Sequence, residues 1–250
     1  MKPEPQPVLT CTDVSKSYGG VHALQGVSLA IAPGEIVGLI GPNGSGKSTL
    51  LHCLGGATTP TRGRIHLQGR DVTGAKPFRL ARMGLSRTFQ RNRVFNEMTI
   101  LENVLASCDW SKVGLLQQLR RPAAAVRERA LVLLAAAGLQ PHADRLASEI
   151  SGGQRRLLEI AMALMPAPKI LMLDEATSGV NPTMIESFVQ YLREVNATQH
   201  SALLIVEHNL QFITALATRV VALEQGRVLV EGTPDQVMSD PRVIEAYLGG

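Results

Sequence analysis

One glycine-rich segment constrains the fold of this chain more than any other feature. It consists of Gly41, Pro42, Asn43, Gly44, Ser45, Gly46, Lys47 and Ser48. The apolar run 36–40 before it predicts a buried strand, and the run that begins at Thr49 predicts the first turns of a helix. Strand, glycine loop and helix are the context that the phosphate-binding loop, or P-loop, requires. The alternative, a glycine-rich turn that binds nothing, does not account for both flanking elements.

The P-loop pattern gives a chemical role to each of its parts. Glycines let successive backbone N–H groups turn inward as an anion-binding nest, and the following helix directs the positive end of its dipole to the same point. Lys47 is expected to reach the β- and γ-phosphates, and the Ser48 hydroxyl to bind Mg²⁺. The sequence therefore predicts a nucleotide site at residues 41–49.

The order of predicted elements indicates an α/β protein. Strands are predicted at 8–14, 22–31, 36–40, 64–71 and 85–89, with a short helix at 78–83. A helix is predicted at 98–107, where Thr99 and Glu102 resemble a capping box. With a second helix at 123–137, it indicates an all-helical lobe between about 91 and 150. Strands at 170–173, 202–206 and 220–223 then alternate with helices at 184–196 and 210–217. This alternation predicts a parallel sheet covered on both faces.

Two carboxylates, Asp174 and Glu175, end a buried predicted strand. In a parallel sheet the carboxyl ends of the strands open onto the ligand crevice, here beside the P-loop. Asp174 is therefore expected to hold Mg²⁺, and Glu175 to polarise the water that attacks the γ-phosphate. The alternative is a surface acidic pair that caps a strand.

Two other polar residues follow predicted strands at the same edge. His208 comes after the strand at 202–206, where its ring N–H can bond a γ-phosphate oxygen, although a lone histidine is more often structural. Gln90 follows the strand at 85–89, where an amide can contact both Mg²⁺ and the attacking water. We therefore predict Glu175, His208, Lys47 and Gln90 as catalytic, and Ser48, Gln90 and Asp174 as metal ligands.

A second anion-binding helix start is predicted at Ser151, Gly152, Gly153 and Gln154. A serine hydroxyl, glycine N–H groups and a helix dipole together suit a phosphate. By itself this motif is more simply an N-cap followed by a flexible turn. Together with a separate P-loop, it suggests a nucleotide held between two copies of the site.

The P-loop, Gln90, Ser151–Gln154, Asp174-Glu175 and His208, in this order, resemble the ATP-binding-cassette (ABC) ATPases over the whole chain. The resemblance implies a P-loop NTPase (RecA-like) α/β core at about 1–90 and 155–250. It adds an N-terminal antiparallel β subdomain and a helical subdomain inserted at about 91–154. It further implies ATP, and a head-to-tail homo- or heterodimer in which the partner's Ser151–Gln154 closes each site.

The same resemblance gives two more residues a role. Tyr18 matches the aromatic residue that stacks on adenine in this family, although a tyrosine in a strand is more often core packing. Asn181 stands where the family's D-loop usually has aspartate. This change keeps a polar link between the two sites of a dimer but weakens its charge.

A closer resemblance rests on segments 85–90, 98–104, 206–209, 232–234 and 240–248. They look like the ATPase subunits of high-affinity branched-chain amino-acid importers. The implied partners are a second ATPase subunit, two membrane permease subunits and, indirectly, a solute-binding protein. Urea and short-chain amide importers remain open alternatives. So do a soluble ABC ATPase that acts on nucleic acid or ribosomes and a cassette that binds ATP without hydrolysis.

Composition limits where the chain can work. No stretch approaches the roughly 20 apolar residues that span a bilayer, and three widely spaced cysteines fit a reducing compartment. Lys76, Arg79, Arg82, Arg87, Arg91 and Arg93 follow one another with no acid among them. Such a stretch suits anionic lipid, nucleic acid or an acidic protein surface, or is a solvated face. We expect a peripheral protein on the cytoplasmic face of the membrane, with no nucleic-acid partner.

Overall fold

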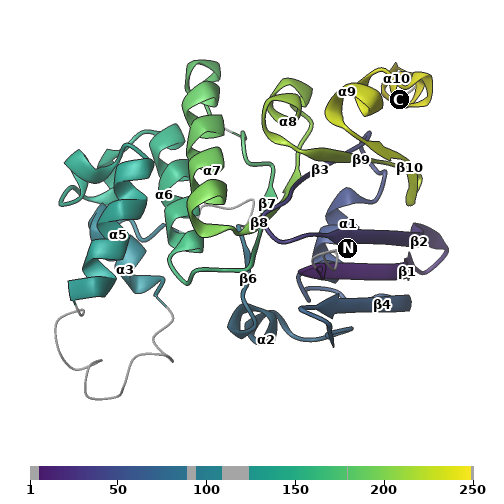
Figure 1. The fold of residues 1–250 in the computed structure, drawn as a ribbon, viewed down its shortest axis with the longest axis horizontal. Helices are drawn as coiled ribbons and strands as arrows, with labels where there is room; N and C mark the ends of the chain where they lie inside the picture. The colour runs from purple at the N-terminus through teal and green to yellow at the C-terminus, as the bar shows by residue number, and fades with distance from the viewer. Residues whose placement is uncertain (1–5, 89–93, 109–123, 179, 249–250) are drawn as a thin grey trace, which may run out of the picture.

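The computed structural model describes residues 6–88, 94–108, 124–178 and 180–248, and places two sheets beside a group of helices (Figure 1). The strands are β1 (Leu9–Tyr18), β2 (Val21–Ile31), β3 (Ile36–Ile40), β4 (Arg62–Leu67), β5 (Arg70–Asp71), β6 (Leu85–Arg87), β7 (Ile170–Asp174), β8 (Ala202–Val206), β9 (Arg219–Glu224) and β10 (Arg227–Gly232). The α-helices are α1 (Lys47–Leu54), α2 (Pro77–Arg82), α3 (Ile100–Ala106), α5 (Ala124–Ala136), α6 (Gly152–Leu164), α7 (Ile185–Gln199), α8 (Leu210–Leu216), α9 (Pro234–Met238) and α10 (Pro241–Leu248). Short 3-10 turns occur at Gln140–His142, Ala147–Glu149 and Pro182–Met184.

The larger sheet has the strand order β10-β9-β3-β8-β7-β6. Its pairs from β9 to β6 are parallel, which confirms the prediction made from alternating strands and helices. Strand β10 instead pairs antiparallel with β9, and the sequence interpretation had not assigned it or the two helices that follow. The carboxyl ends of β3, β7 and β8 therefore lie along one edge, where the predicted site residues follow them.

The larger sheet is buried on both faces, which explains its continuous apolar strands. In β3, Ile36 and Ile40 point into a core shared with α3, α5, α6, α7 and α8. Val37 and Leu39, which alternate with them, point into a second core formed with α1 and the smaller sheet. Because successive side chains in a strand face opposite sides, one apolar strand contributes to both cores.

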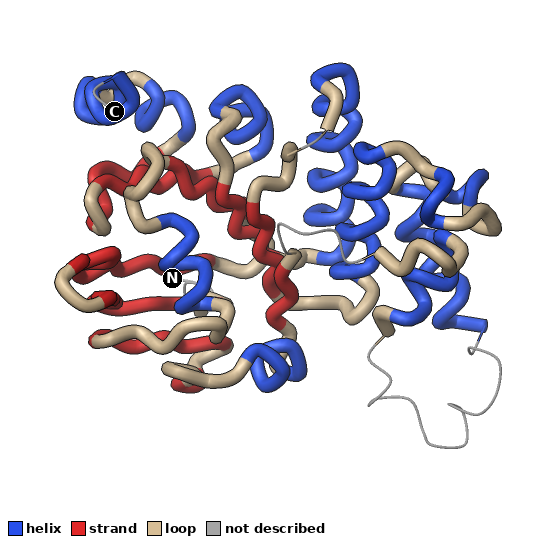
Figure 2. Tube along the Cα trace, turned by 180° about the vertical axis from the view of Figure 1, so that it is seen from behind, coloured by secondary structure: helices blue, strands red, loops and turns tan. Residues whose placement is uncertain are grey.

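The smaller sheet is antiparallel, with the strand order β2-β1-β4-β5. On the opposite side of the molecule, α3, α5 and α6 pack together next to α7 (Figures 1 and 2). Helix α3 begins with the predicted capping box, in which Thr99 Oγ1 accepts from Glu102 N at 3.2 Å. Among the described residues, none of the helices combines the length and apolar character needed to cross a bilayer.

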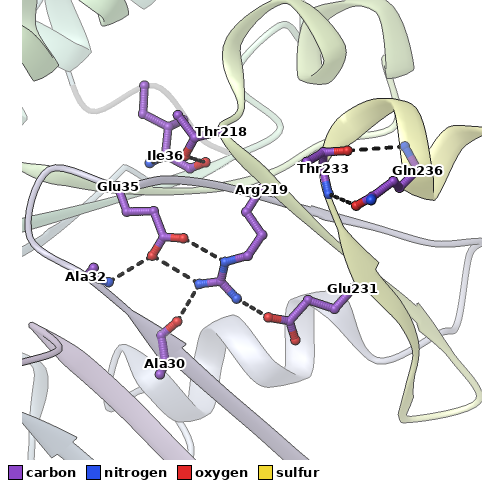
Figure 3. A network of polar contacts seen from close by, with 9 residues as sticks. All are labelled: Ala30, Ala32, Glu35, Ile36, Thr218, Arg219, Glu231, Thr233 and Gln236. Carbon is purple, nitrogen blue, oxygen red and sulfur yellow. Dashed lines mark hydrogen bonds and ion pairs between the residues drawn. The ribbon is translucent and has the colours of Figure 1, made fainter. Parts of the chain in front are cut away.

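Arg219 connects the smaller sheet to the larger one through hydrogen bonds and ion pairs (Figure 3). Its guanidinium donates to both carboxylate oxygens of Glu35, at 2.6 and 3.0 Å, and to the Ala30 carbonyl at 2.5 Å. It also pairs with Glu231 on β10. A bidentate arginine–carboxylate pair is the strongest and most directional form of this contact. The contact fixes the start of β3, and with it the strand that leads into the P-loop.

Candidate nucleotide-binding site

The P-loop connects β3 to α1 and needs glycine at two positions for steric reasons. Gly41 has a φ of 144°, and a Cβ atom there would lie 2.2 Å from the Leu223 carbonyl oxygen. Gly46 has a φ of 104°, and its Cβ would lie 2.6 Å from the Ala23 carbonyl oxygen. Both backbone conformations are rare for L side chains. The loop is therefore held in its curved form by β2 and β9.

Lys47 is folded over this loop. Its Nζ donates to the carbonyl oxygens of Gly41 at 2.7 Å and Pro42 at 2.8 Å. Burial lowers the pKa of the Lys47 ammonium, while the nearby carboxylates of Glu175 and Asp174 oppose that shift. A half-buried cation held by neutral carbonyls gains strongly from a phosphate, since charge-assisted hydrogen bonds are about twice as strong as neutral ones.

A cleft of about 420 Å³ runs along the loop. Its lining includes most of the residues predicted from the sequence: Tyr18, Asn43, Gly44, Gly46, Lys47, Ser48, Thr49, Glu175 and His208. A larger cavity of about 590 Å³ lies against the same loop beside Arg242 and Glu245 of α10. Lys47, Glu175 and His208 line the smaller cleft, so we take that one as the candidate site.

Asp174 ends β7 close to the loop and is buried. Its Oδ2 accepts from Arg87 Nη2 at 2.9 Å. Its Oδ1 is also buried and has no hydrogen-bond partner among the described residues. A buried oxygen without a partner is costly, and a cation is a suitable partner for it. Together with the Ser48 hydroxyl, Asp174 Oδ1 fits Mg²⁺, which binds through one or two protein oxygens and substrate phosphates.

Glu175 and His208 face the cleft from adjacent strands. Glu175 follows β7 with a φ of 48°, and its N–H donates to the Val206 carbonyl at 2.9 Å. His208 follows β8, and its side chain is exposed. The parallel pairing of β7 with β8 places Asp174 opposite Val206. The two predicted catalytic groups are thus brought to one wall of the cleft by sheet register.

Tyr18 ends β1 at the rim of the cleft and is 49% exposed. The Lys16 ammonium lies 4.9 Å from the centre of its ring. Exposure of a large aromatic ring beside a polar cleft does not fit core packing, which was the alternative for this residue. Its predicted contact with adenine stays a prediction.

Ser151–Gln154 lie apart from this cleft, at the start of α6. Ser151 Oγ accepts from Gln154 N at 3.2 Å, and the Gln154 side chain accepts from Ser151 N at 3.0 Å, which forms a capping box. Ser151 and Gly152 are exposed, whereas Gly153 packs against Met184. The turn is therefore open to a second molecule, as a role in trans requires. Gln90 lies outside the described residues.

Arg87 corrects one interpretation of the sequence. Lys76, Arg79 and Arg82 are exposed on and beside α2, but the Arg87 side chain is only 9% exposed and pairs with Asp174. A cation on β6 was therefore counted in a surface patch although it pairs with a candidate site residue. Its partner lies 87 residues further along the chain, a separation that charge patterning does not reveal.

Three other residues near the site were not singled out from the sequence. Arg156 and Glu207 are buried and contact the backbone around Glu175. Tyr247 on α10 accepts a hydrogen bond from Gly41 N at 2.8 Å. Glu207 carried a usable signal, because a carboxylate directly before His208 ends a wholly apolar strand. The Tyr247 contact spans 206 residues and had no local signal.

Comparison with protein-family models gives two matches. The model described as "ABC transporter" matches residues 24–178. The model described as "Branched-chain amino acid ATP-binding cassette transporter" matches residues 227–250. The second segment contains β10, α9 and α10, the part of the fold whose elements the sequence interpretation left unassigned.

Three individual proteins illustrate what the chain is similar to. It is 39% identical to the high-affinity branched-chain amino acid transport ATP-binding protein LivG of Escherichia coli K12, over 98% of each chain. The ADP conformation of MJ1267, an ATP-binding cassette of an ABC transporter, superposes with a TM-score of 0.87 at 33% identity, covering 98% of this chain and 100% of that one. The dimeric structure of the bacterial cassette MJ0796 gives 0.77 at 28% identity, covering 90% and 98%.

Proposed function

Because this chain belongs to the ABC transporter family of ATP-binding cassettes, we propose that it is the ATP-hydrolysing subunit of an importer of branched-chain or related amino acids. The family is one of ATPases, and the match of residues 227–250 to a branched-chain model favours that cargo. Cargo is inferred from similarity alone, since a cassette need not touch it. ATPase subunits of urea or amide importers and soluble ABC ATPases are the competing functions.

The observation that carries the proposal is the cleft shared by Lys47, Glu175 and His208. Lys47 exchanges its two carbonyl partners for β- and γ-phosphate oxygens, and the Glu175 carboxylate accepts a proton from the attacking water. His208 donates to the γ-phosphate, and Tyr18 stacks on adenine. Gln90 is proposed as a catalytic residue and Mg²⁺ ligand only because it follows β6 in the sequence.

Ser48 and Asp174 are the proposed Mg²⁺ ligands. The ion supplies positive charge to the β- and γ-phosphate oxygens when it is bound. Arg87 holds Asp174 through Oδ2, which leaves Oδ1 directed away from that ion pair. Among the described residues, no group of three metal-binding side chains occurs. Phosphate oxygens and water are proposed to supply the remaining ligands.

The exposed turn at Ser151–Gln154 is proposed to close the cleft of a second cassette, either a copy of this chain or a sibling. Moving a two-state element from nearly open to nearly closed needs about 5.5 kcal/mol of differential binding. Hydrogen bonds to charged groups contribute about 1.5–3 kcal/mol each. Two or three contacts from Ser151, Gly153 and the helix end supply about 3–9 kcal/mol in total, a range that includes this requirement, and loss of the γ-phosphate removes them.

The permease subunits are proposed to dock beside α2. Exposed Phe78, Arg79 and Arg82 adjoin a small cavity of about 240 Å³ lined by Pro77 and Leu85 among others. An apolar depression rimmed by cations suits a membrane protein's cytoplasmic loop and nearby anionic lipid. We therefore propose that the subunit is peripheral, on the cytoplasmic face of the membrane.

Glu175→Gln tests the hydrolytic role. The purified variant should bind ATP with wild-type affinity, accumulate as a closed dimer and hydrolyse ATP about 10²–10⁴-fold more slowly. Wild-type turnover would remove Glu175 as the base. For cargo, cells that depend on this chain should lose uptake of labelled leucine when Lys47 is changed to Ala. Loss of urea uptake with intact leucine uptake would favour the competing importer.

A further inference from the structure

The turn after β7 holds Glu175 in an uncommon backbone conformation. Its φ of 48° lies in the left-handed region, which costs a non-glycine residue about 1 kcal/mol or more. Such a conformation persists only where surrounding contacts hold it. Two buried side chains of opposite charge, Arg156 and Glu207, supply those contacts from different elements.

Arg156 holds the carbonyl oxygens of the turn. Its Nη2 donates to Asp174 O at 2.8 Å and to Glu175 O at 3.2 Å, and its Nε donates to Ala176 O at 3.2 Å. Its Nη1 pairs with Glu159 Oε2 at 2.7 Å. One planar guanidinium therefore fixes three successive carbonyls, a geometry that a lysine ammonium cannot reproduce.

Glu207 holds the N–H groups on the other side. It is fully buried after β8. Its Oε1 accepts from Thr177 N at 2.5 Å and from Thr177 Oγ1 at 2.8 Å. Its Oε2 accepts from His208 N at 3.1 Å and Asn209 N at 3.4 Å. One carboxylate thus ties the segment that carries Glu175 to the segment that carries His208.

We propose that Arg156 and Glu207 are positioning residues that clamp the 174–177 turn and so orient the Glu175 carboxylate toward the nucleotide. This inference rests on the function proposed above for Glu175. Arg156 lies two positions after Gln154 on α6. A tilt of that helix, when Ser151–Gln154 engage a partner's nucleotide, is therefore transmitted to the carbonyls around Glu175. The clamp connects the two ATP sites of a dimer.

A purely structural role for the same charges makes a different prediction. A residue that only stabilises the fold lowers the melting temperature, and it leaves the turnover of the molecules that remain folded unchanged. A residue that positions Glu175 lowers kcat at temperatures where the protein is fully folded. ATP affinity of the P-loop cleft should stay unchanged, because neither Arg156 nor Glu207 lines it.

Glu207→Gln tests the anionic half of the clamp. The side chain keeps its shape but loses its charge and one acceptor, so we expect kcat to fall about tenfold to a hundredfold, the effect of displacing a catalytic group by about 1 Å. Thr177→Val removes only the hydroxyl donor and should give a smaller loss of the same kind. Glu194→Gln, on the exposed face of α7, is the control and should match wild type.

Arg156→Lys tests the cationic half. It keeps a charge beside Glu159 but cannot reach three carbonyls, so kcat should again fall at least tenfold with unchanged ATP affinity. The matched control is Arg129→Lys. Arg129 donates to the Leu164 and Met165 carbonyls at the far end of the same helix, at 3.0 Å. It should lower stability and leave kcat intact.

Circular dichroism at the assay temperature and ATP titration accompany each kinetic measurement. Wild-type kcat in folded Glu207→Gln, Thr177→Val and Arg156→Lys, with Glu175→Gln inactive, would overturn the clamp and leave the proposed function standing. Wild-type turnover in Glu175→Gln would instead remove Glu175 as the base, and absence of ATP turnover in the wild-type chain would overturn the proposed function itself. If Glu207→Gln does not fold, the other two variants decide.

Discussion

The P-loop and the Ser151–Gln154 turn are both helix N-termini, but their surroundings differ. Gly46 at the start of α1 makes no side-chain cap in the described structure, and β2 and β9 enclose the loop. Ser151 at the start of α6 has its own capping box and is exposed. The first therefore leaves N–H groups for a ligand inside a cleft. The second is capped without one, and we propose that it meets a ligand held by another molecule.

Among the changes that test this comparison, Lys47→Ala should have the largest effect, which is on ATP affinity at the P-loop. It removes the cation that faces the cleft, and with it the two proposed hydrogen bonds to phosphate. Because each such bond contributes about 1.5–3 kcal/mol, ATP affinity should fall at least about a hundredfold. Equilibrium titration of the purified chain with a fluorescent ATP analogue measures it. Lys169→Ala, at an exposed position outside the cleft, is the control. Equal affinity in Lys47→Ala and wild type would contradict the assignment of the cleft.

Ser151→Ala should distinguish the two regions most clearly, because it should weaken dimerisation and leave ATP binding unchanged. ATP affinity of the single chain should stay at the wild-type value. The ATP-driven dimer of the Glu175→Gln background should weaken at least about a hundredfold, because each of its two sites loses one hydrogen bond to a charged group, worth at least about tenfold. Sedimentation velocity measures the dimer. Thr99→Ala removes the matching cap of α3 and should cost the same stability, about 1 kcal/mol, with no change in dimerisation. Equal dimer loss in both variants would reduce Ser151 to an ordinary cap.

Tyr247→Phe should have a smaller effect on the P-loop. It leaves the buried Gly41 N–H without its acceptor, which costs about 1–2 kcal/mol of folding free energy. Part of that cost should appear as a severalfold weaker affinity for ATP, because the loop starts at Gly41. Thermal unfolding and ATP titration measure the two effects. If neither changes, α10 does not support the loop.

The pH dependence of ATP binding should show the smallest effect. Burial lowers the pKa of Lys47 from its ordinary value of 10.5 in the free protein. Bound phosphates favour the charged form and raise that pKa, so ATP binding takes up a proton in the pH window between the pKa of the free protein and that of the complex. Affinity should be constant below this window and fall through it by no more than about tenfold per pH unit. Calorimetry in buffers of different ionisation enthalpy measures the proton, which should disappear in Lys47→Met.

Local patterns in the sequence were enough to predict most of the elements that form the core. The strand, loop and helix around Gly41–Ser48, the apolar strands of the parallel sheet and the capping box of α3 depend on neighbours in the chain, and the predictions for them are confirmed. Fold class and family are confirmed as well. Roles for individual site residues stay proposals.

What the sequence did not reveal depends on contacts between distant segments. Arg87 was interpreted as a surface cation because its partner, Asp174, lies across the sheet. Elements β10, α9 and α10 are only six, five and eight residues long, and two of them begin at prolines. The left-handed conformation of Glu175 also has no signature in its own neighbours, since Arg156 and Glu207 hold it from other elements.

Mixing two inactive chains tests most directly whether each catalytic centre is built from both regions on different molecules. Lys47→Ala keeps an intact Ser151 turn, and Ser151→Arg keeps an intact P-loop, so each homodimer lacks a complete site. An equal mixture should recover about a quarter of wild-type ATPase activity, because half of the dimers are mixed and each carries one intact site. A mixture as inactive as its components, although mixed dimers form, would contradict the account.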